Sequence, residues 1–201
     1  MAGWIQKLEG KIGRAILSLP PGLLRVLSGG VTRNDAGHTL DPRIQMGLLL
    51  SRIHASAENL SPVEARRQLS SLLGHFDLLP EPVARVEDFS IPGQDNKRIR
   101  MRLYSATCEA RLQPAMLYFH GGGFVIGDLD TTDAILRTLA IQSGLVILSV
   151  DYRLAPEYPY PAGAEDALEA YRWVLDHGHN LGIDANRLGL GGDSAGGNLC
   201  L

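Results

Sequence analysis

The sequence contains only two cysteines, Cys108 and Cys200, and they lie far apart. It has no CxxC pattern and no cluster of cysteine and histidine, so it carries neither a disulfide framework nor the signature of a zinc site. We therefore expect two free thiols in a reducing compartment and no bound metal. These features predict a cytoplasmic protein.

Clustered positive charge and long apolar runs are also missing. The formal net charge is -3 and the lysines and arginines are scattered, whereas surfaces that bind nucleic acid concentrate basic residues. No segment approaches the roughly 20 apolar residues of a membrane span. Near the N-terminus charged residues interrupt the apolar ones and Pro20-Pro21 ends them, which is not the pattern of an export signal. We expect no nucleic-acid partner and no membrane span.

The first 75 or so residues are predicted to be helical. Apolar residues recur at three- and four-residue steps over Trp4–Leu17 and again over Pro42–Leu60. Ser61-Pro62-Val63-Glu64 combines a capping residue, a proline at the first helical position and a capping-box glutamate, and so predicts the start of a third helix. We assign residues 1–79 to an N-terminal helical segment and residues 80–201 to a second domain.

From residue 80 onward the pattern predicts a sheet with crossover helices. Two strands joined by a turn are expected first, over Val83–Ile91 and Ile99–Tyr104. The elements expected after them are a buried strand over Ala115–Phe119, a helix over Thr131–Ser143 ended by Gly144, a buried strand over Leu145–Val150, a helix over Ala164–His177 and a short strand over Arg187–Leu190. This alternation is typical of α/β folds with a largely parallel sheet.

Gly192-Asp193-Ser194-Ala195-Gly196 matches the pattern G-x-S-x-G. It follows a short predicted strand and precedes a possible helix, which is where a nucleophilic serine must stand to project from a sharp turn. Flanking glycines allow that turn, and a helix that begins at Ala195 directs backbone N–H groups toward developing negative charge. Short matches of this kind also arise by chance, so an ordinary glycine-rich turn is the alternative.

A second glycine-rich motif, His120-Gly121-Gly122-Gly123-Phe124, follows the buried strand that ends at Phe119. A run of glycines lets the backbone approach an oxyanion closely enough to donate several N–H groups to it. The alternative is a loop that cradles phosphate. No Lys-Ser/Thr pair follows, as a P-loop requires, and no G-x-G-x-x-G pattern is present, which argues against a nucleotide site.

A third segment, Asp151 to Ala162, reads DYRLAPEYPYPA and follows the other buried strand. With the HGGGF and GDSAGG segments in this order and spacing, residues 80–201 closely resemble the hormone-sensitive-lipase-like carboxylesterases, also called bacterial family IV. The resemblance implies an α/β-hydrolase fold, with three αβα layers and a mostly parallel sheet, and hydrolysis of short-acyl carboxylic esters without a cofactor. It also implies that residues 1–79 form a helical cap lining the acyl pocket.

Carried over residue by residue, the resemblance makes Ser194 the nucleophile. It assigns the oxyanion-hole donors to the backbone N–H groups of Gly122, Gly123 and Ala195, with His120 and Gly121 holding the loop. We expect Asp193 to make a structural hydrogen bond in the turn rather than to act as the catalytic acid. For Arg153 and Glu157 we expect a buried pair that supports its loop, and substrate contact is the alternative.

The sequence departs from the family after the serine. In this fold an Asp or Glu and then a His follow the nucleophile, and the seven residues Ala195 to Leu201 contain none of these. We expect a truncated form of a protein of about 300 residues, which on its own is nearly inactive. The remaining histidines, His38, His54, His75, His177 and His179, are interpreted as surface or structural residues.

Two other hypotheses stay open. A small-molecule binding module can keep this fold while losing catalytic residues, although a binder needs neither Ser194 nor the glycine loop. The strand that precedes Ser194 would also lack a neighbour on one side, and an open edge invites pairing with another chain. A homodimer that shields this edge is therefore an alternative to a monomer.

Overall fold

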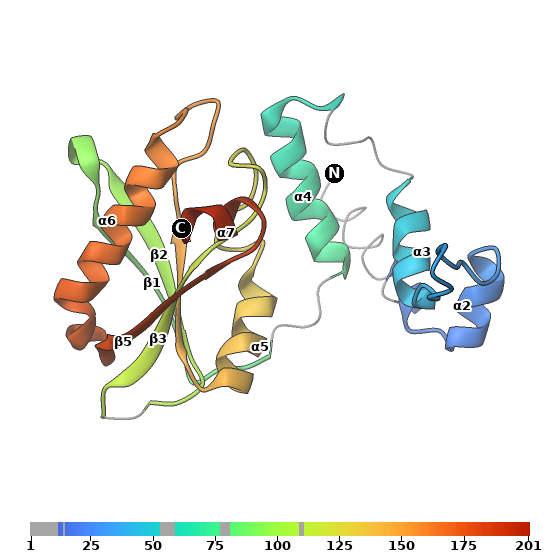
Figure 1. Ribbon diagram of the computed structural model, residues 1–201, viewed down its shortest axis with the longest axis horizontal. Helices are drawn as coiled ribbons and strands as arrows, with labels where there is room; N and C mark the ends of the chain where they lie inside the picture. Colours follow the sequence, from blue (N-terminus) through green and yellow to red (C-terminus); the bar gives the residue numbers. More distant parts are fainter. Residues whose placement is uncertain (1–11, 14, 53–58, 77–80, 109–110) are drawn as a thin grey trace. The chain divides into compact units, whose positions relative to one another are not determined.

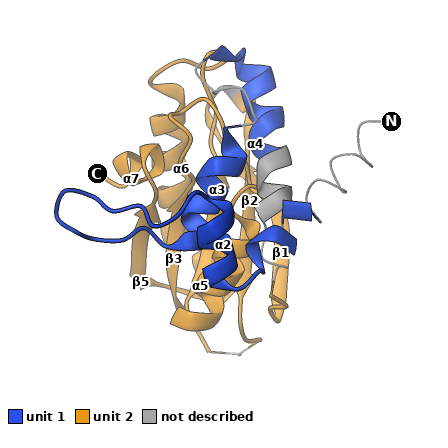
Figure 2. Ribbon diagram, turned by 90° about the vertical axis from the view of Figure 1, so that its right-hand side faces the viewer, with its two compact units in different colours: residues 1–77 blue, residues 78–201 orange. Residues whose placement is uncertain are grey.

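The computed structural model describes residues 12–13, 15–52, 59–76, 81–108 and 111–201. The chain divides into two compact units, Met1–Asp77 and Leu78–Leu201 (Figure 2). Among the described residues, no helix has both the length and the apolar character needed to cross a membrane.

The described part of the first unit contains three named helices, α2 (Pro21–Leu27), α3 (Pro42–Ser51) and α4 (Pro62–Phe76). Helix α2 was not predicted: Pro21 occupies its first turn, where proline is tolerated because the missing N–H has no helical partner. The helix predicted over Pro42–Leu60 ends as α3 at Ser51, and residues 53–58 lie outside the described residues. Of the helix predicted over Trp4–Leu17, residues 12–13 and 15–17 are described and are helical.

The capping box at the start of α4 is confirmed. The Ser61 N–H donates to Glu64 Oε2 at 2.9 Å, and the Glu64 N–H donates to Ser61 Oγ at 3.4 Å. The Ser61 hydroxyl also donates to Glu64 Oε2, at 2.6 Å, and the hydrogen bonds donated by the hydroxyl and the backbone N–H of Ser61 lower the pKa of the Glu64 carboxyl. The local motif thus fixes the start of this helix independently of its packing.

The second unit is built on one five-stranded sheet in the order β1-β2-β4-β3-β5. Its strands are β1 (Arg85–Pro92), β2 (Arg98–Ser105), β3 (Gln113–Phe119), β4 (Val146–Asp151) and β5 (Ile183–Gly192). Strand β3 lies between β4 and β5 and is parallel to both, while β1, β2 and β4 pair antiparallel. The parallel core is as expected; the complete sheet is mixed, and β5 is one of its edge strands.

Helices cover both faces of this sheet and produce the three layers (Figure 1). Helix α6 (Ala162–His177) packs with the core residues Val146, Leu148 and Val150, and α5 (Asp133–Ser143) packs with Ile147 from the same strand. Successive side chains of a strand point to opposite faces, so a strand covered on both sides is apolar throughout. That is the physical reason for the continuous apolar run in β4.

The topology brings three loops to one edge of the sheet. Strands β3, β4 and β5 run parallel, so the segments that follow Phe119, Asp151 and Gly192 emerge at the same end. Phe119 and Gly192 are register partners, which places the glycine loop after β3 beside the turn after β5. In parallel α/β sheets the carboxyl ends of the strands are where ligands bind.

Candidate active site

Ser194 occupies a sharp turn between β5 and the short helix α7 (Ala195–Leu199). Its backbone angles are φ 52° and ψ −117°, a sparsely populated conformation for a residue with a side chain. The flanking glycines make the turn possible: a Cβ on Gly192 would lie 2.6 Å from the Phe119 carbonyl oxygen, and a Cβ on Gly196 would overlap the same oxygen. The strained backbone is therefore held by close packing of the turn against the end of β3.

The loop that follows β3 is held open by glycines at positive φ. Gly122 has φ 120° and Gly123 has φ 60°, and a Cβ on Gly122 would overlap the Ile126 carbonyl oxygen. The Gly122 carbonyl accepts hydrogen bonds from the N–H groups of Val125 and Ile126, both at 3.1 Å. The Gly122 carbonyl thus points into the loop, where it accepts both of these hydrogen bonds.

Three backbone N–H groups at this edge have no acceptor among the residues that the structure describes. Within the described part of the chain, no group accepts a hydrogen bond from the N–H of Gly122, Gly123 or Ala195. Unpaired backbone N–H groups are costly when buried, and where they gather beside a nucleophile they are suited to bind an anion. Ala195 is also the first residue of α7, where the first N–H groups of a helix have no partner within it.

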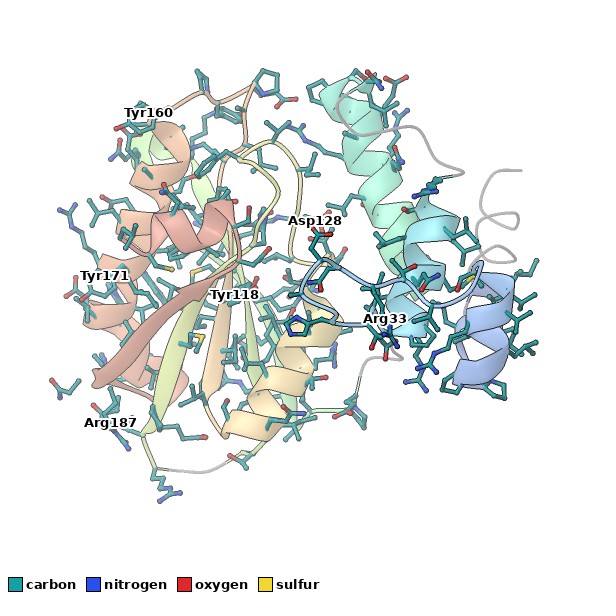
Figure 3. The ribbon with its side chains drawn as sticks, turned by 45° about the vertical axis from the view of Figure 1, so that its right-hand side comes forward. Arg33, Tyr118, Asp128, Tyr160, Tyr171 and Arg187 are labelled. Atoms are coloured by element: carbon teal, nitrogen blue, oxygen red, sulfur yellow. The ribbon has the colours of Figure 1, made fainter. Side chains whose placement is uncertain are left out.

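Asp193 joins the two motifs directly. Its Oδ1 accepts hydrogen bonds from the Gly121 N–H at 2.8 Å and from the Tyr118 hydroxyl at 2.9 Å. Tyr118, labelled in Figure 3, lies within the sheet of the second unit, and burial together with the hydrogen bond to Asp193 raises the pKa of its hydroxyl. A Cβ on Gly121 would overlap Asp193 Oδ2. The structure therefore brings Ser194 and the HGGG segment together.

His120 is fully buried beneath this loop. Its Nδ1 lies 2.8 Å from the Gly121 carbonyl oxygen and so carries the proton, and its ring stacks on Tyr152 with a centroid separation of 4.4 Å. The Tyr152 hydroxyl donates to the His120 carbonyl at 2.7 Å. A Cβ on Gly127 would overlap His120 Nδ1, so the glycine leaves room for the imidazole. Sequence reasoning did not single out Tyr152, whose only signal was its place directly after β4.

The buried partner of Arg153 is Asp166 rather than Glu157. Asp166 is 1% exposed and its side chain lies 2.8 Å from Arg153 Nη2, while its Oδ2 also accepts the Arg153 N–H at 2.9 Å. Glu157 is exposed, so the prediction of a buried Arg153–Glu157 pair is wrong in that respect. Asp166 stands on the otherwise apolar buried face of α6, and a charge on that face was the signal that the sequence offered.

No histidine among the described side chains is hydrogen-bonded to Ser194 Oγ. His177 lies at the end of α6, where it stacks on Trp173 with a centroid separation of 5.0 Å. His38 belongs to the first unit, while His54 and the side chain of His75 lie outside the described residues. Within the described ranges there is also no group of three or more His, Cys, Asp or Glu residues that could hold a metal ion.

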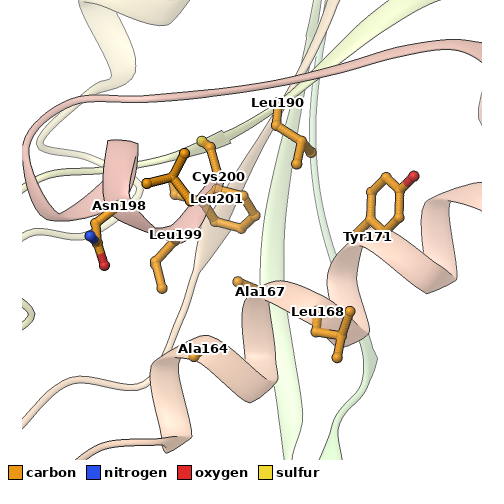
Figure 4. A pocket seen from close by; sticks show the side chains of 10 residues that line it. Ala164, Ala167, Leu168, Tyr171, Leu190, Asn198, Leu199, Cys200 and Leu201 are labelled. Carbon is orange, nitrogen blue, oxygen red and sulfur yellow. The ribbon is translucent and has the colours of Figure 1, made fainter.

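A cavity of about 340 Å³ opens beside α6 and does not include the serine (Figure 4). Its lining is mostly apolar and comes from α6, from strands β3 and β5, and from the last residues of the chain. The lining residues are Phe119, Ala164, Ala167, Leu168, Tyr171, Leu190, Asn198, Leu199, Cys200 and Leu201. Because neither Ser194 nor the glycine loop reaches it, we assign this cavity no part in the site.

Comparison with known proteins gives matches to α/β hydrolases and esterases. A family model described as the alpha/beta hydrolase fold matches residues 116–201. Carboxylic ester hydrolase LipN of Mycobacterium tuberculosis is 36% identical over 98% of this chain and 54% of its own length. Esterase LipI of the same organism is 48% identical over 68% of this chain and 42% of its own length.

Comparison with solved structures also finds esterases. A thermophilic carboxylesterase from a metagenomic library is 46% identical, with a TM-score of 0.66 over 73% of this chain and 49% of that protein. The chain thus spans about half the length of the relatives it matches.

Proposed function

We propose that the chain belongs to the hormone-sensitive-lipase-like group of α/β-hydrolase esterases that it resembles, and that the protein hydrolyses short-acyl carboxylic esters through an acyl intermediate on Ser194. The observation that carries the proposal is the free N–H groups of Gly122, Gly123 and Ala195 beside the strained serine. A binding module has no need of either feature. Ethyl acetate hydrolase of Pseudomonas putida, 37% identical over 80% of this chain, is a relative with such an activity.

In the proposed reaction Ser194 Oγ attacks the carbonyl carbon of the ester and forms a bond to it as its own proton passes to a base. The carbonyl oxygen becomes an oxyanion, which the N–H groups of Gly122, Gly123 and Ala195 stabilise more strongly than they stabilise the neutral carbonyl. The C–O bond then breaks, the alcohol leaves with the proton, and the acyl group remains on Ser194. Water then attacks the acyl carbon in the same geometry and gives a proton to the base. The bond from the acyl carbon to Ser194 Oγ breaks, the base returns the proton to Oγ, and the carboxylic acid leaves.

The base expected in this fold is an imidazole oriented by a carboxylate. No described residue supplies it, so we expect the 201 residues by themselves to be nearly inactive, with slight residual rate from the oxyanion donors. We further propose that residues 1–79 act as a cap segment over the acyl pocket, and that a second copy covers the edge strand β5. A mass measurement in solution tests the second proposal.

The function is tested by measuring the hydrolysis of p-nitrophenyl acetate and p-nitrophenyl butyrate. Two samples are compared, the protein as its gene encodes it and the 201-residue chain. We expect turnover of both esters by the former and about background rate for the latter. A fluorophosphonate should label Ser194 in the active form. A folded protein that hydrolyses neither ester and stays unlabelled would instead be a binding module.

Alanine at Gly122 and at Gly123 forms a matched pair of variants. At Gly122 the φ of 120° belongs almost only to glycine and a Cβ meets the Ile126 carbonyl, whereas at Gly123 the φ is 60° and nothing lies within 4 Å. We expect Gly122→Ala to lower kcat for p-nitrophenyl butyrate about 100-fold, because the loop must move, and Gly123→Ala to lower it less than about 10-fold. Equal losses in both variants would contradict the loop geometry.

A further inference from the structure

We infer that Asp193 is a positioning residue, whose carboxylate sets the separation between the oxyanion donors and the nucleophile; the inference rests on the proposed function. Asp193 neither reaches the reacting atoms nor serves as the acid of a triad in this account. It acts through Gly121, to which it is hydrogen-bonded at 2.8 Å. The two residues are 72 positions apart in the sequence, so their contact is made by the fold.

Asp193 makes hydrogen bonds to two segments, through its carboxylate to β3 and the loop that follows it, and through its backbone carbonyl to the turn after β5. On the loop side, Oδ1 receives the Gly121 N–H and the Tyr118 hydroxyl, both from β3 and the loop that follows it. On the turn side, the Asp193 carbonyl accepts the Gly196 N–H at 2.8 Å. Asp193 therefore spans the gap between the end of β3 and the turn that carries Ser194.

The residues that follow Gly121 and Asp193 carry the proposed oxyanion donor and the proposed nucleophile. Gly122, whose N–H is a proposed donor, follows Gly121, and Ser194 follows Asp193. A shift in the Gly121–Asp193 contact consequently moves the Gly122 N–H relative to Ser194 Oγ. Gly121 must be glycine for the same reason, since a Cβ there would overlap Asp193 Oδ2 and push the carboxylate away.

The acceptor oxygen, rather than the negative charge, is the useful property of Asp193. A carboxylate beside an oxyanion opposes the charge that develops there, so the charge itself does not favour the transition state. Burial and the Asp193 hydrogen bond raise the pKa of Tyr118, so its hydroxyl stays protonated and remains a donor. An asparagine, which keeps one carbonyl oxygen and loses the charge, should preserve the contact.

The experiment compares Asp193→Ala, Asp193→Asn and Tyr118→Phe with a control, Asp184→Ala. Asp184 also accepts a backbone N–H, from Asn186 at 3.1 Å, but near the other end of β5, beside the Arg187 labelled in Figure 3. The measurements are hydrogen exchange at the Gly121 amide and, in the protein as its gene encodes it, kcat and KM for p-nitrophenyl butyrate.

We expect Asp193→Ala to speed exchange at Gly121 and to lower kcat about 10- to 100-fold with KM within about threefold of wild type. In Asp193→Asn, kcat should stay within about threefold of the wild-type value. Tyr118→Phe should lower kcat less than Asp193→Ala does, and Asp184→Ala should leave kcat unchanged. Equal losses in the alanine and asparagine variants, or unchanged exchange at Gly121 in Asp193→Ala, would overturn the inference.

If Asp193→Ala does not fold, the inference is tested with Tyr118→Phe. A faster hydrogen exchange of the Gly121 amide in Tyr118→Phe than in Asp184→Ala supports the inference, and an exchange rate equal to that of Asp184→Ala refutes it. The exchange measurement needs no ester. A wild-type protein that hydrolyses no ester therefore defeats the proposed function while the hydrogen-bond link remains separately testable.

Discussion

Replacing Ser194 with alanine is expected to lower kcat for p-nitrophenyl butyrate by about 10⁴-fold or more and to abolish labelling by a fluorophosphonate. The proposed oxyanion donors, the N–H groups of Gly122, Gly123 and Ala195, remain in this variant, but no side-chain oxygen is present to form the proposed acyl intermediate. Water must then attack the ester directly. Activity and labelling are measured in the protein as its gene encodes it.

A matched serine variant separates this loss from general damage. Ser149 is also a serine of the second unit, fully buried in β4, and its hydroxyl has no partner among the described residues. Ser149→Ala should keep both labelling and turnover. Ser194→Ala should keep its thermal stability, because alanine adopts the φ of 52° at about the same strain as serine. Labelling that persists in Ser194→Ala would place the nucleophile elsewhere.

Replacing Asp166 with alanine is expected to lower the free energy of unfolding by about 3–5 kcal/mol. Asp166 is 1% exposed and binds both the guanidinium and the backbone N–H of Arg153, whose side chain is 16% exposed. Without the carboxylate, a largely buried guanidinium loses the acidic partner that lies 2.8 Å from its Nη2, which costs far more than the loss of a surface pair. Urea denaturation measures the change.

The control for Asp166 lies on the same helix. Glu169 pairs with Arg172 at 3.2 Å across the exposed side of α6, with side-chain exposures of 30% and 61%. Glu169→Ala should change the free energy of unfolding by less than about 0.5 kcal/mol, as expected for an exposed pair within a helix. If the two variants were equally stable, Asp166 would not be the buried anchor of the loop after β4.

The loop that Asp166 anchors is connected to the glycine loop. The Ala155 N–H donates to the Phe124 carbonyl at 2.9 Å, which ties the segment after Arg153 to the segment after His120. Loss of Asp166 is therefore expected to reduce activity as well as stability. The DYRLAPE segment of this chain thus supports the glycine loop although it supplies no proposed reacting group.

Local patterns in the sequence predicted the elements well where one interaction dominates. Three features were predicted: the apolar runs of β3 and β4, the Ser61–Glu64 capping box, and the end of α5 at Gly144. They depend on burial, on a short-range hydrogen bond and on a left-handed φ respectively, and each of these is indicated by a few neighbouring residues in the sequence. Helix α2 was missed because Pro20-Pro21 was interpreted only as a break.

Strand β5 was predicted too short, over Arg187–Leu190 instead of Ile183–Gly192, because its glycines and polar residues carry no strand pattern and pairing with β3 determines its length. Long-range contacts were the least predictable part of the candidate site. The motifs made Ser194 and the glycine loop candidates for the site, but the hydrogen bond between Gly121 and Asp193 depends on the register of β3 and β5. A buried Arg153–Glu157 pair was predicted, whereas Glu157 is exposed and the buried carboxylate beside Arg153 is Asp166 from the next helix.

The central claim is that the N–H groups of Gly122, Gly123 and Ala195 converge on an oxyanion formed at Ser194 Oγ. A crystal structure of the protein after reaction with a p-nitrophenyl alkylphosphonate tests it most directly. The account predicts a covalent bond from phosphorus to Ser194 Oγ and a phosphoryl oxygen within about 3.1 Å of those three nitrogens. An unmodified Ser194, or a phosphoryl oxygen directed to solvent, would contradict it.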